Sequence, residues 1–344
     1  MIQQNQPITG ITHLLLTRSF EIIALYNTQR ENMLFKNIYI YRFTKPFTLT
    51  PEQLEEKLAS AAIQPCGPQE LFRQGWSRPL GRDGRQLVHT TNGNMMLTLA
   101  KEERLLPPSV VKESLDERVQ SIEDEQHRKV RKNEKDELKD QIIHELLPKA
   151  FKRSQYTQGY IDAKNGWLII NTASAKKADD FNGFLRKTLG SLPVMVPQVR
   201  QNPSAIMTTW LQGKDALSLD FTLCDECELQ SRAEEKSIVR CKGLDIESEE
   251  VQGHIKADRR VVKIAVSWQD HISFVLNEDL TIKRIKYGEL LNEKLEDNQA
   301  ETAAEKFDAA FALMSLEFAN LIERILYLFG GEDRSKISED FRPV

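Results

Sequence analysis

The stretch PPSVVKESLDERVQSIEDEQHRKVRKNEKDELKDQIIHELLPK, residues 107–149, interrupts a chain that otherwise alternates between strand and helix patterns. Ser109 can cap a helix, and apolar residues follow it at helical spacing. Across residues 123–139 only Val130 and Leu138 are apolar, so a helix there has no broad face to bury. We therefore expect a protruding helical arm over residues 107–149. It is either one helix about 58 Å long or a hairpin bent at its charged middle.

The residues on both sides of the arm carry strand and helix signals typical of an α+β fold. Residues 34–43 alternate and are rich in Ile, Tyr and Phe, which predicts a strand. Thr50 and Gln53 have the spacing of a capping box and predict a helix start. The Asn-Gly pairs at 92–93 and 165–166 lie between apolar runs and predict two hairpins.

The order of these signals predicts mixed sheets with helices in two domains. We expect residues 33–106 together with 150–198 to form a central α+β domain, from which the arm protrudes. Residues 199–344 are expected to form a second α/β base domain that ends in a long core helix. Residues 1–32 are expected to be a non-native or disordered leader, because Met33 opens the first convincing strand pattern.

Composition excludes several classes of protein. The 344 residues are 40% hydrophobic and 28% charged, which is ordinary globular composition. Four cysteines are too few for a disulfide-stapled secreted fold. No apolar run approaches the roughly 18 residues that a membrane span needs. We therefore expect a cytoplasmic protein without a membrane partner.

Positive charge gathers in one part of an acidic chain. The net charge is −4, yet residues 127–153 hold nine Lys or Arg against five Asp or Glu. Such a surface attracts phosphate polymers, because each cation that neutralises a phosphate releases condensed counterions. The alternative interpretation is a solvated helix face whose charges only keep it soluble.

The motif search indicates no catalytic or metal site. Glycine loops for nucleotides are absent, and the paired carboxylates at 102–103 are interpreted as ordinary solvated residues. Cys224 and Cys227, with Cys241 and His254, have the residue types of a zinc site. Acidic neighbours would raise the pKa of these thiols, so we set zinc and redox chemistry aside. We expect no enzyme, no cofactor and no metal.

The cations outside and within the arm form the candidate binding residues. None belongs to a helix-turn-helix with base-reading side chains, so we expect contacts to phosphates without sequence choice. The run 149–153 interleaves an aromatic residue with three cations, and Phe151 is either core or contact. Lys176 and Lys177 begin a helix, whose backbone amides add anion affinity. The candidate residues are Lys101, Arg104, Arg128, Lys129, Arg131, Lys132, Lys149, Phe151, Lys152, Arg153, Lys176, Lys177 and Lys242.

Several sequence blocks, in order, resemble the RdgC family of bacterial recombination-associated DNA-binding proteins. The resemblance begins at Met33 and covers essentially all of the chain after it. The blocks that carry it are Phe35-Lys36-Asn37, Pro65-Cys66-Gly67, Gly75-Trp76, Lys101-Glu102-Glu103, Leu106-Pro107, Glu134-Lys135-Asp136, Leu138-Lys139-Asp140, Leu146-Leu147-Pro148, the run 173–178, the run 189–193 and the run 283–286.

The resemblance implies a non-enzymatic, sequence-indifferent protein that closes as a ring-forming homodimer around duplex DNA. It also implies binding of single strands, restraint of RecA filaments, a link to replication, and association with the nucleoid. Arg128 would then lie at the arm tip and Phe151 in the hole of the ring. Gly243 and Leu244 depart from the basic or polar residues expected there, which puts a DNA contact at Lys242 in doubt. The alternative function is a protein-interaction module that grips RecA or another partner through its basic arm, without encircling DNA.

Overall fold

The computed structural model describes residues 34–214, 217–233, 237–296 and 300–338, and the chain divides into two compact units. Among these described residues, unit 1 comprises 34–40 and 196–336, and unit 2 comprises 41–195 and 337–338. The expected leader, residues 1–32, lies outside the described residues. Each unit contains strands and helices, so the expected α+β class is confirmed.

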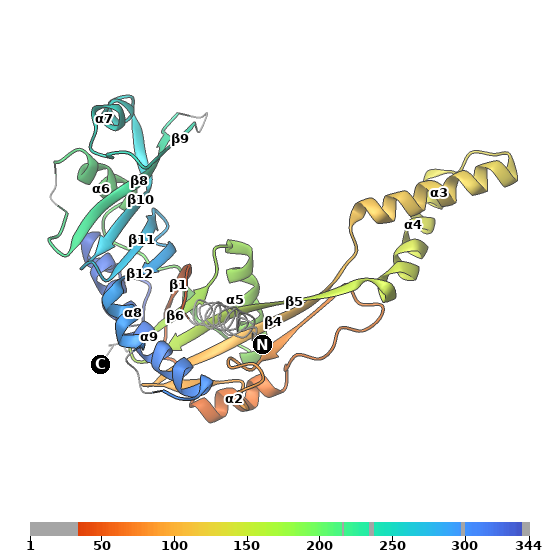
Figure 1. Ribbon diagram of the computed structural model, residues 1–344, viewed down its shortest axis with the longest axis horizontal. Helices are drawn as coiled ribbons and strands as arrows, with labels where there is room; N and C mark the ends of the chain where they lie inside the picture. Colours follow the sequence, from red (N-terminus) through yellow and green to blue (C-terminus); the bar gives the residue numbers. More distant parts are fainter. Residues whose placement is uncertain (1–33, 215–216, 234–236, 297–299, 339–344) are drawn as a thin grey trace, which may run out of the picture. The chain divides into compact units, whose positions relative to one another are not determined.

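Unit 2 is built on an antiparallel sheet (Figure 1). Its strand order is β2-β4-β5-β6-β1, with β3 on β4 and β7 on β1. The strands of both units pair antiparallel in ten pairings, in place of the mixed pairing expected, and the isolated bridge between Ala62 and Trp76 is parallel. The strands are β1 (Ile38–Phe43), β2 (Phe72–Ser77), β3 (His89–Thr91), β4 (Asn94–Leu105), β5 (Phe151–Asp162), β6 (Trp167–Asn171) and β7 (Val194–Met195).

Two helices supply the core of unit 2. In α2 (Pro51–Ala59) Thr50 and Gln53 form the predicted capping box, and Ser174 caps α5 (Ala175–Leu189) by accepting from a backbone N–H. Trp76 of β2 is fully buried and meets Phe181 of α5 edge to face, with ring centroids 5.4 Å apart. Aromatic burial of this kind fixes the helix on the sheet.

The arm is a helical hairpin. Helix α3 (Pro108–Gln126) and helix α4 (Lys132–Leu146) are joined by residues 127–131, and a 3₁₀ turn η1 (Leu147–Lys149) returns to the sheet. Ser109 is the expected cap of the helix, but the N-cap is Pro107 and α3 begins at Pro108. A proline suits the first helical position because the N–H there has no partner within the helix. His127 ends α3 in the left-handed conformation, which reverses the chain.

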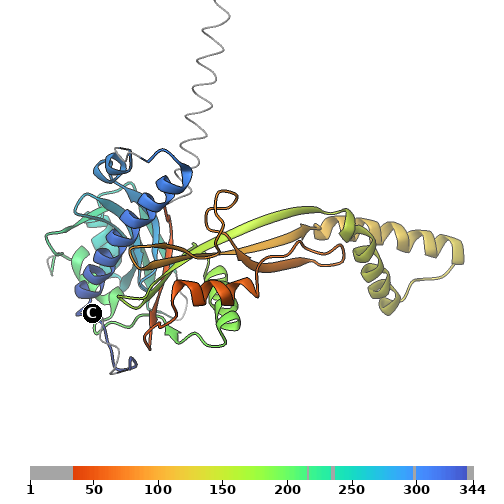
Figure 2. The ribbon, with the colours of Figure 1, turned by 90° about the horizontal axis from the view of Figure 1, so that it is seen from below.

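Strands β4 and β5 carry the arm. They pair without a break from Asn94↔Asp162 to Leu105↔Phe151, twelve residues on each side, and this pair of strands is here called the ribbon. Strand β2 also pairs with β4, over Thr98–Glu103. In Figures 1 and 2 the α3–α4 hairpin lies at the end of this ribbon. The Asn92-Gly93 turn that begins β4 is the predicted hairpin, with both residues at positive φ.

Unit 1 contains a second run of antiparallel strands and the long C-terminal helix. Its strand order is β12-β11-β10-β8-β9. The boundary between the units falls within β1, and Ile38, in the part of β1 that belongs to unit 1, pairs with Ile282 of β12. Its strands are β8 (Phe221–Ser231), β9 (Ile238–Lys242), β10 (Arg259–Trp268), β11 (Ile272–Asn277) and β12 (Ile282–Tyr287). Its helices are α6 (Pro203–Leu211), α7 (Glu249–Lys256), α8 (Glu289–Glu296) and α9 (Ala303–Leu328).

Helix α9 organises the core of unit 1. Thr302 caps it with a complete capping box, and Phe318 is buried against Phe35, with ring centroids 6.5 Å apart. Arg324 donates two hydrogen bonds to Asp220, which holds the pKa of that carboxyl well below its usual range. None of the helices in the described ranges is long and apolar enough to cross a membrane.

Candidate nucleic-acid interface

The turn between the arm helices, residues 127–131, is here called the arm turn. Arg128 donates to both carboxylate oxygens of Glu134, at 2.7 and 2.8 Å, and Lys129 lies 2.8 Å from Glu123. Glu123 also accepts from the backbone N–H of Val130, whose side chain is buried. The Arg128 guanidinium lowers the pKa of Glu134, and Lys129 lowers that of Glu123.

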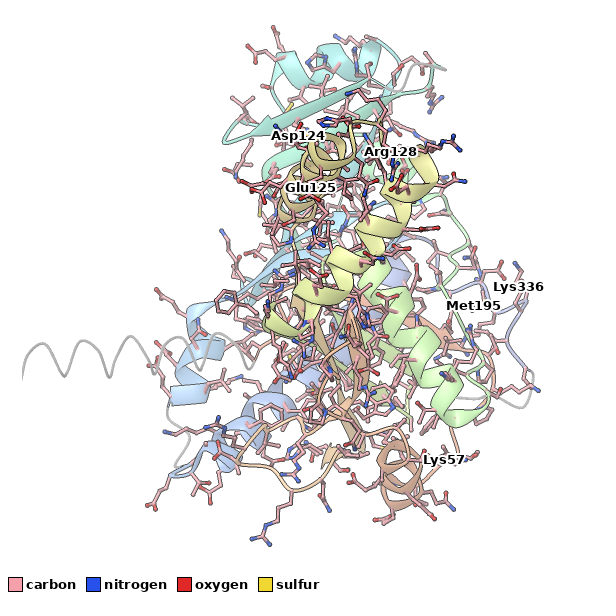
Figure 3. All side chains as sticks on the ribbon, turned by 90° about the vertical axis from the view of Figure 1, so that its right-hand side faces the viewer. Lys57, Asp124, Glu125, Arg128, Met195 and Lys336 are labelled. Carbon is pink, nitrogen blue, oxygen red and sulfur yellow. The ribbon has the colours of Figure 1, made fainter. Side chains whose placement is uncertain are left out.

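These ion pairs hold the arm turn together. They involve Arg128 and Lys129, which the sequence indicates as candidate DNA-binding residues. Figure 3 labels Arg128 with Asp124 and Glu125 at this end of the hairpin, where acidic and basic side chains mix. Arg131 and Lys132, which begin α4, have no ion-pair partner among the described residues. At this end of the arm, some cations are therefore held in ion pairs and others are not.

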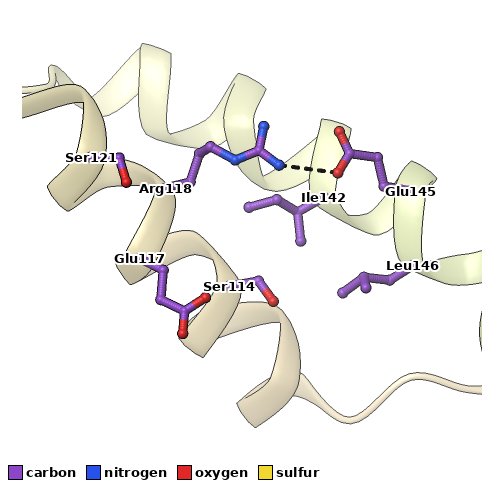
Figure 4. A pocket seen from close by; sticks show the side chains of 7 residues that line it. All are labelled: Ser114, Glu117, Arg118, Ser121, Ile142, Glu145 and Leu146. Carbon is purple, nitrogen blue, oxygen red and sulfur yellow. Dashed lines mark hydrogen bonds and ion pairs between the residues drawn. The ribbon is translucent and has the colours of Figure 1, made fainter. Parts of the chain in front are cut away.

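The arm also contains a groove of about 280 Å³ between its two helices (Figure 4). Arg118 of α3 reaches across to Glu145 of α4 at 3.1 Å. Ile142 forms the buried floor of the helix contact. The residues that line the groove are Ser114, Glu117, Arg118, Ser121, Ile142, Glu145 and Leu146.

The second cluster lies where the ribbon meets the arm, at residues 101–105 and 149–155, here called the root. Antiparallel pairing sets Glu103 opposite Arg153 and Lys101 opposite Gln155. Side chains of directly paired residues share a face, so all four converge. Glu103 accepts from Arg153 Nε at 2.9 Å, from Arg153 Nη2 and from Gln155 Nε2 at 2.8 Å. Lys101 Nζ is 3.8 Å from the same carboxylate.

Alternation along the strand places the neighbouring residues of the root on the opposite face. Glu102 accepts from the backbone N–H of Cys66 at 3.0 Å and pairs with Lys152 at 2.9 Å. Lys152 donates in turn to the carbonyl of Cys66 at 3.3 Å. The hydrogen bond from Lys152 lowers the pKa of Glu102, and the one from Arg153 lowers that of Glu103. Neither carboxylate is the ordinary solvated residue that the sequence suggested.

Arg104 is occupied by backbone carbonyls. Its Nε donates to Gly67 at 3.1 Å, and its Nη1 donates to Leu147 at 3.1 Å and to Pro148 at 3.2 Å. The guanidinium thereby joins the 66–70 loop to the end of the arm. Such charge-assisted bonds are strong, so this cation positions the root.

Phe151 is an exposed aromatic residue of the root. Its side chain is 85% exposed, and it lies opposite Leu105, so it is not core. Phe72 of β2 lies on the same face, with Lys101 Nζ 4.6 Å from its ring centroid. Lys149 in η1 has no ion-pair partner among the described residues. An exposed ring between cations is a surface on which a base can stack.

The remaining candidate residues belong to other elements. Lys176 and Lys177 occupy the first turn of α5, and both are exposed. Lys242 ends β9 in unit 1, where it pairs in register with Glu226. Within the described ranges these three cations also make no ion pair. The root thus contains six of the candidate residues: Lys101, Arg104, Lys149, Phe151, Lys152 and Arg153. Strand register places Lys101 and Arg153 on one face of the two strands, and Arg104 and Lys152 on the other.

The cysteines do not assemble a metal site in the described part of the chain. No group of three or more His, Cys, Asp or Glu side chains there could hold a metal ion. Cys227 faces Cys241 across β8 and β9, and burial raises the pKa of Cys227 to about 12. Burial, followed by the neighbouring Asp225, also raises the pKa of Cys224.

Comparison with known proteins identifies the family. Residues 33–332 match a family model described as "Putative exonuclease, RdgC". A "Recombination-associated protein RdgC" from Aeromonas hydrophila is 44% identical over 303 residues, which cover 88% of this chain and all of that protein. Proteins of the same name from Tolumonas auensis and Psychromonas ingrahamii are 45% and 42% identical, over 87% of this chain and 99% of each. An α+β chain with this match belongs to a family associated with recombination. It belongs to the RdgC family.

Proposed function

We propose that this protein binds DNA through the phosphate backbone, without sequence choice, and that the root is its main contact surface. The observation that carries the proposal is the root itself. Five cations stand there against two carboxylates, and Phe151 is 85% exposed beside them. A net positive surface on an acidic chain attracts a polyanion selectively to one place. The names of the relatives, which place them in recombination, agree with a DNA substrate.

A salt titration tests this proposal directly. Fluorescence anisotropy would measure the affinity for a random-sequence duplex between 50 and 200 mM salt. If six to ten phosphates are neutralised, affinity should fall by roughly 10³ to 10⁵-fold over this range. The slope should be the same for duplexes of unrelated sequence, and single strands should bind with a shallower one. A flat titration, or a strong preference for one sequence, overturns the proposal.

We further propose that two copies close as a ring around the duplex, with the arms as the gate. Support comes from the arm, a hairpin at the end of a long ribbon whose turn buries one apolar side chain, Val130. A ring retains a polymer without tight base contacts.

The test of the ring uses Glu125→Cys near the arm turn, in a Cys224→Ser background, with a bis-maleimide cross-linker. Cross-linked dimer loaded on circular DNA should resist high salt and leave when the circle is cut. Equal release from circular and linear DNA, or a monomer by sedimentation, rejects the ring.

Restraint of RecA would then follow from occupation of its DNA, and nucleoid association from the same binding. The alternative is a direct grip on RecA through the arm, for which the groove between α3 and α4 is the specific observation. A variant that cannot bind DNA distinguishes the two, because it keeps its effect on RecA filaments only if contact is direct.

We propose a binding protein and not a nuclease, although the family description names an exonuclease. The root holds its two carboxylates in ion pairs with cations, as suits phosphate contact. Incubation of end-labelled duplex with Mg²⁺ or Mn²⁺ provides the test. A nuclease would shorten the labelled strand in proportion to the amount of protein. This activity would also have to copurify with the wild-type protein and be lost in a root variant.

A further inference from the structure

The cluster around Glu103 has the donor set of a phosphate site with a carboxylate already in it. The carboxylate oxygens of Glu103 are surrounded by the guanidinium of Arg153, the amide of Gln155 and the ammonium of Lys101. A phosphodiester also presents one negative charge on two free oxygens. Arg and Lys bind carboxylate and phosphate through the same hydrogen bonds. The cluster is therefore chemically equivalent to an occupied phosphate position.

The position of the cluster makes the occupant replaceable. Glu103 is only 21% exposed, whereas Arg153 is 56% exposed on the solvent side of the pair. The ring of Phe72 lies over Lys101 at 4.6 Å, and Phe151 lies next to Lys152 and Arg153 in β5 without cover. An approaching polyanion would therefore meet the cations before it met the carboxylate. Exposed ion pairs are individually weak, so they exchange partners readily.

We propose that Glu103 is an internal substitute for a DNA phosphate, which holds Arg153, Lys101 and Gln155 in a closed arrangement until a phosphate displaces it. This regulation of the site rests on the proposed DNA binding. Glu103 keeps the cations ordered in the free protein, and its charge lowers affinity for the polymer. The root thus releases nucleic acid more readily than its cations alone would allow.

Glu102 provides the contrast within the same strand. It is tied to the backbone N–H of Cys66, and its partner Lys152 is tied to the carbonyl of the same residue. Both ends of that pair are anchored to one loop. The carboxylate of Glu103 instead accepts its hydrogen bonds from the side chains of Arg153 and Gln155. Its pair can therefore open by side-chain rotation, whereas the Glu102 pair must also release the backbone of the loop.

The first experiment compares Glu103→Gln with wild type and with Glu145→Gln by anisotropy on a random-sequence duplex. Glu145 pairs with Arg118 in the arm, so its variant has the same change in net charge at an ion pair outside the root. Removing one negative charge next to a bound phosphate should tighten binding about five-fold at low salt. The salt slope should stay close to that of wild type, because the phosphate that displaces Glu103 in the wild type makes the same contact. Glu145→Gln should change affinity less than two-fold, because the partner of Glu145 is Arg118 of the arm and not a cation of the root.

The second experiment asks whether the effect passes through Arg153. In an Arg153→Ala background the Glu103→Gln gain should disappear, because the released cation is absent. A gain that persists there, or one that Glu145→Gln equals, overturns the inference. Glu103→Asp keeps the charge on a shorter stem and should fall between wild type and Glu103→Gln. It serves as the second variant if Glu103→Gln does not fold.

The two proposals fail differently. A wild-type protein with a steep salt slope and an unchanged Glu103→Gln variant rejects only the role of Glu103. A wild-type protein with no salt-dependent binding rejects both the DNA interface and this regulation of it.

Discussion

The arm turn and the root contain the same chemistry but differ in charge balance and in the support beneath the side chains. Residues 123–134 carry four cations and four carboxylates, whereas residues 101–105 and 149–155 together carry five cations and two carboxylates. The ion pairs of the arm turn join residues six apart in sequence, whereas Lys152–Glu102 and Arg153–Glu103 in the root join residues fifty apart on two strands. A dense run of basic residues in the sequence therefore does not by itself indicate a positively charged surface. The charge of the surface depends also on which residues the strand register brings together.

The largest expected effect is on DNA affinity when the root loses its cations. Lys149, Lys152 and Arg153 to Ala should weaken binding by on the order of 10²-fold near 0.1 M salt, equally for all sequences. Arg128, Arg131 and Lys132 to Ala should weaken it about ten-fold or less, because residues 123–134 hold as many carboxylates as cations. Anisotropy on one duplex measures both.

A control for charge alone is available in the same unit. Exposed Lys57, Lys164 and Lys187 can be changed together to Ala. This triple variant should bind close to wild type. If the arm-turn variant loses more affinity than the root variant, the arm turn contributes more to DNA binding and the root is not the main contact surface.

The second effect concerns the support of the root. Arg104→Lys keeps the charge but cannot reach Gly67, Leu147 and Pro148 at once. Loss of these charge-assisted bonds should lower the local opening free energy of β5 by about 2 kcal/mol. Hydrogen exchange of the amides of residues 151–158 measures it.

Arg128→Lys in the arm turn is the matched change, and it should leave exchange in β5 unaltered. The salt slope of Arg104→Lys should equal that of wild type, since this cation meets carbonyls and not phosphates. A slope lower by about 0.9 would instead make Arg104 a phosphate contact.

The smallest expected effect is the pH dependence of the root. The pKa values of Glu102 and Glu103 are lowered in the folded protein, so the unfolded chain binds more protons in the window between the folded and unfolded pKa values. The stabilisation is therefore complete above an unfolded pKa of about 4.3 and is lost as pH falls through the folded values.

Acid unfolding followed by exchange in β5 should reveal this loss. A double variant, Glu102→Gln with Glu103→Gln, should remove most of the dependence below pH 4.3 or so. A wild-type protein whose root stability rises as pH falls would contradict the lowered values.

Local signals predicted much of the fold. Thr50 with Gln53, Ser174 and the Asn-Gly turn at 92–93 act through neighbours within a few residues, and each lies where expected. Helix α9 has apolar residues at helical spacing along 26 residues, which identifies a buried helix from sequence alone.

The missed elements lack such local signals. Strand β2 contains Gly75, which is required because a Cβ there would meet the backbone of Ile63 at 2.4 Å. The outer half of β5, residues 151–158, is exposed or half-buried on both faces, so no alternation of burial marks it as a strand. Its partner β4 stabilises it through hydrogen bonds that leave no pattern in the sequence.

The sequence by itself determined the α+β class, the helical character of residues 107–149, most caps and turns, and the family, because these depend on short-range spacing and on ordered blocks of residues. Only the tertiary structure decided which cations are committed to partners. It brought Glu103 to Arg153, joined Arg104 to the end of the arm and exposed Phe151. The reason is that strand register pairs residues far apart in sequence, and an ion pair depends on the distance between its atoms.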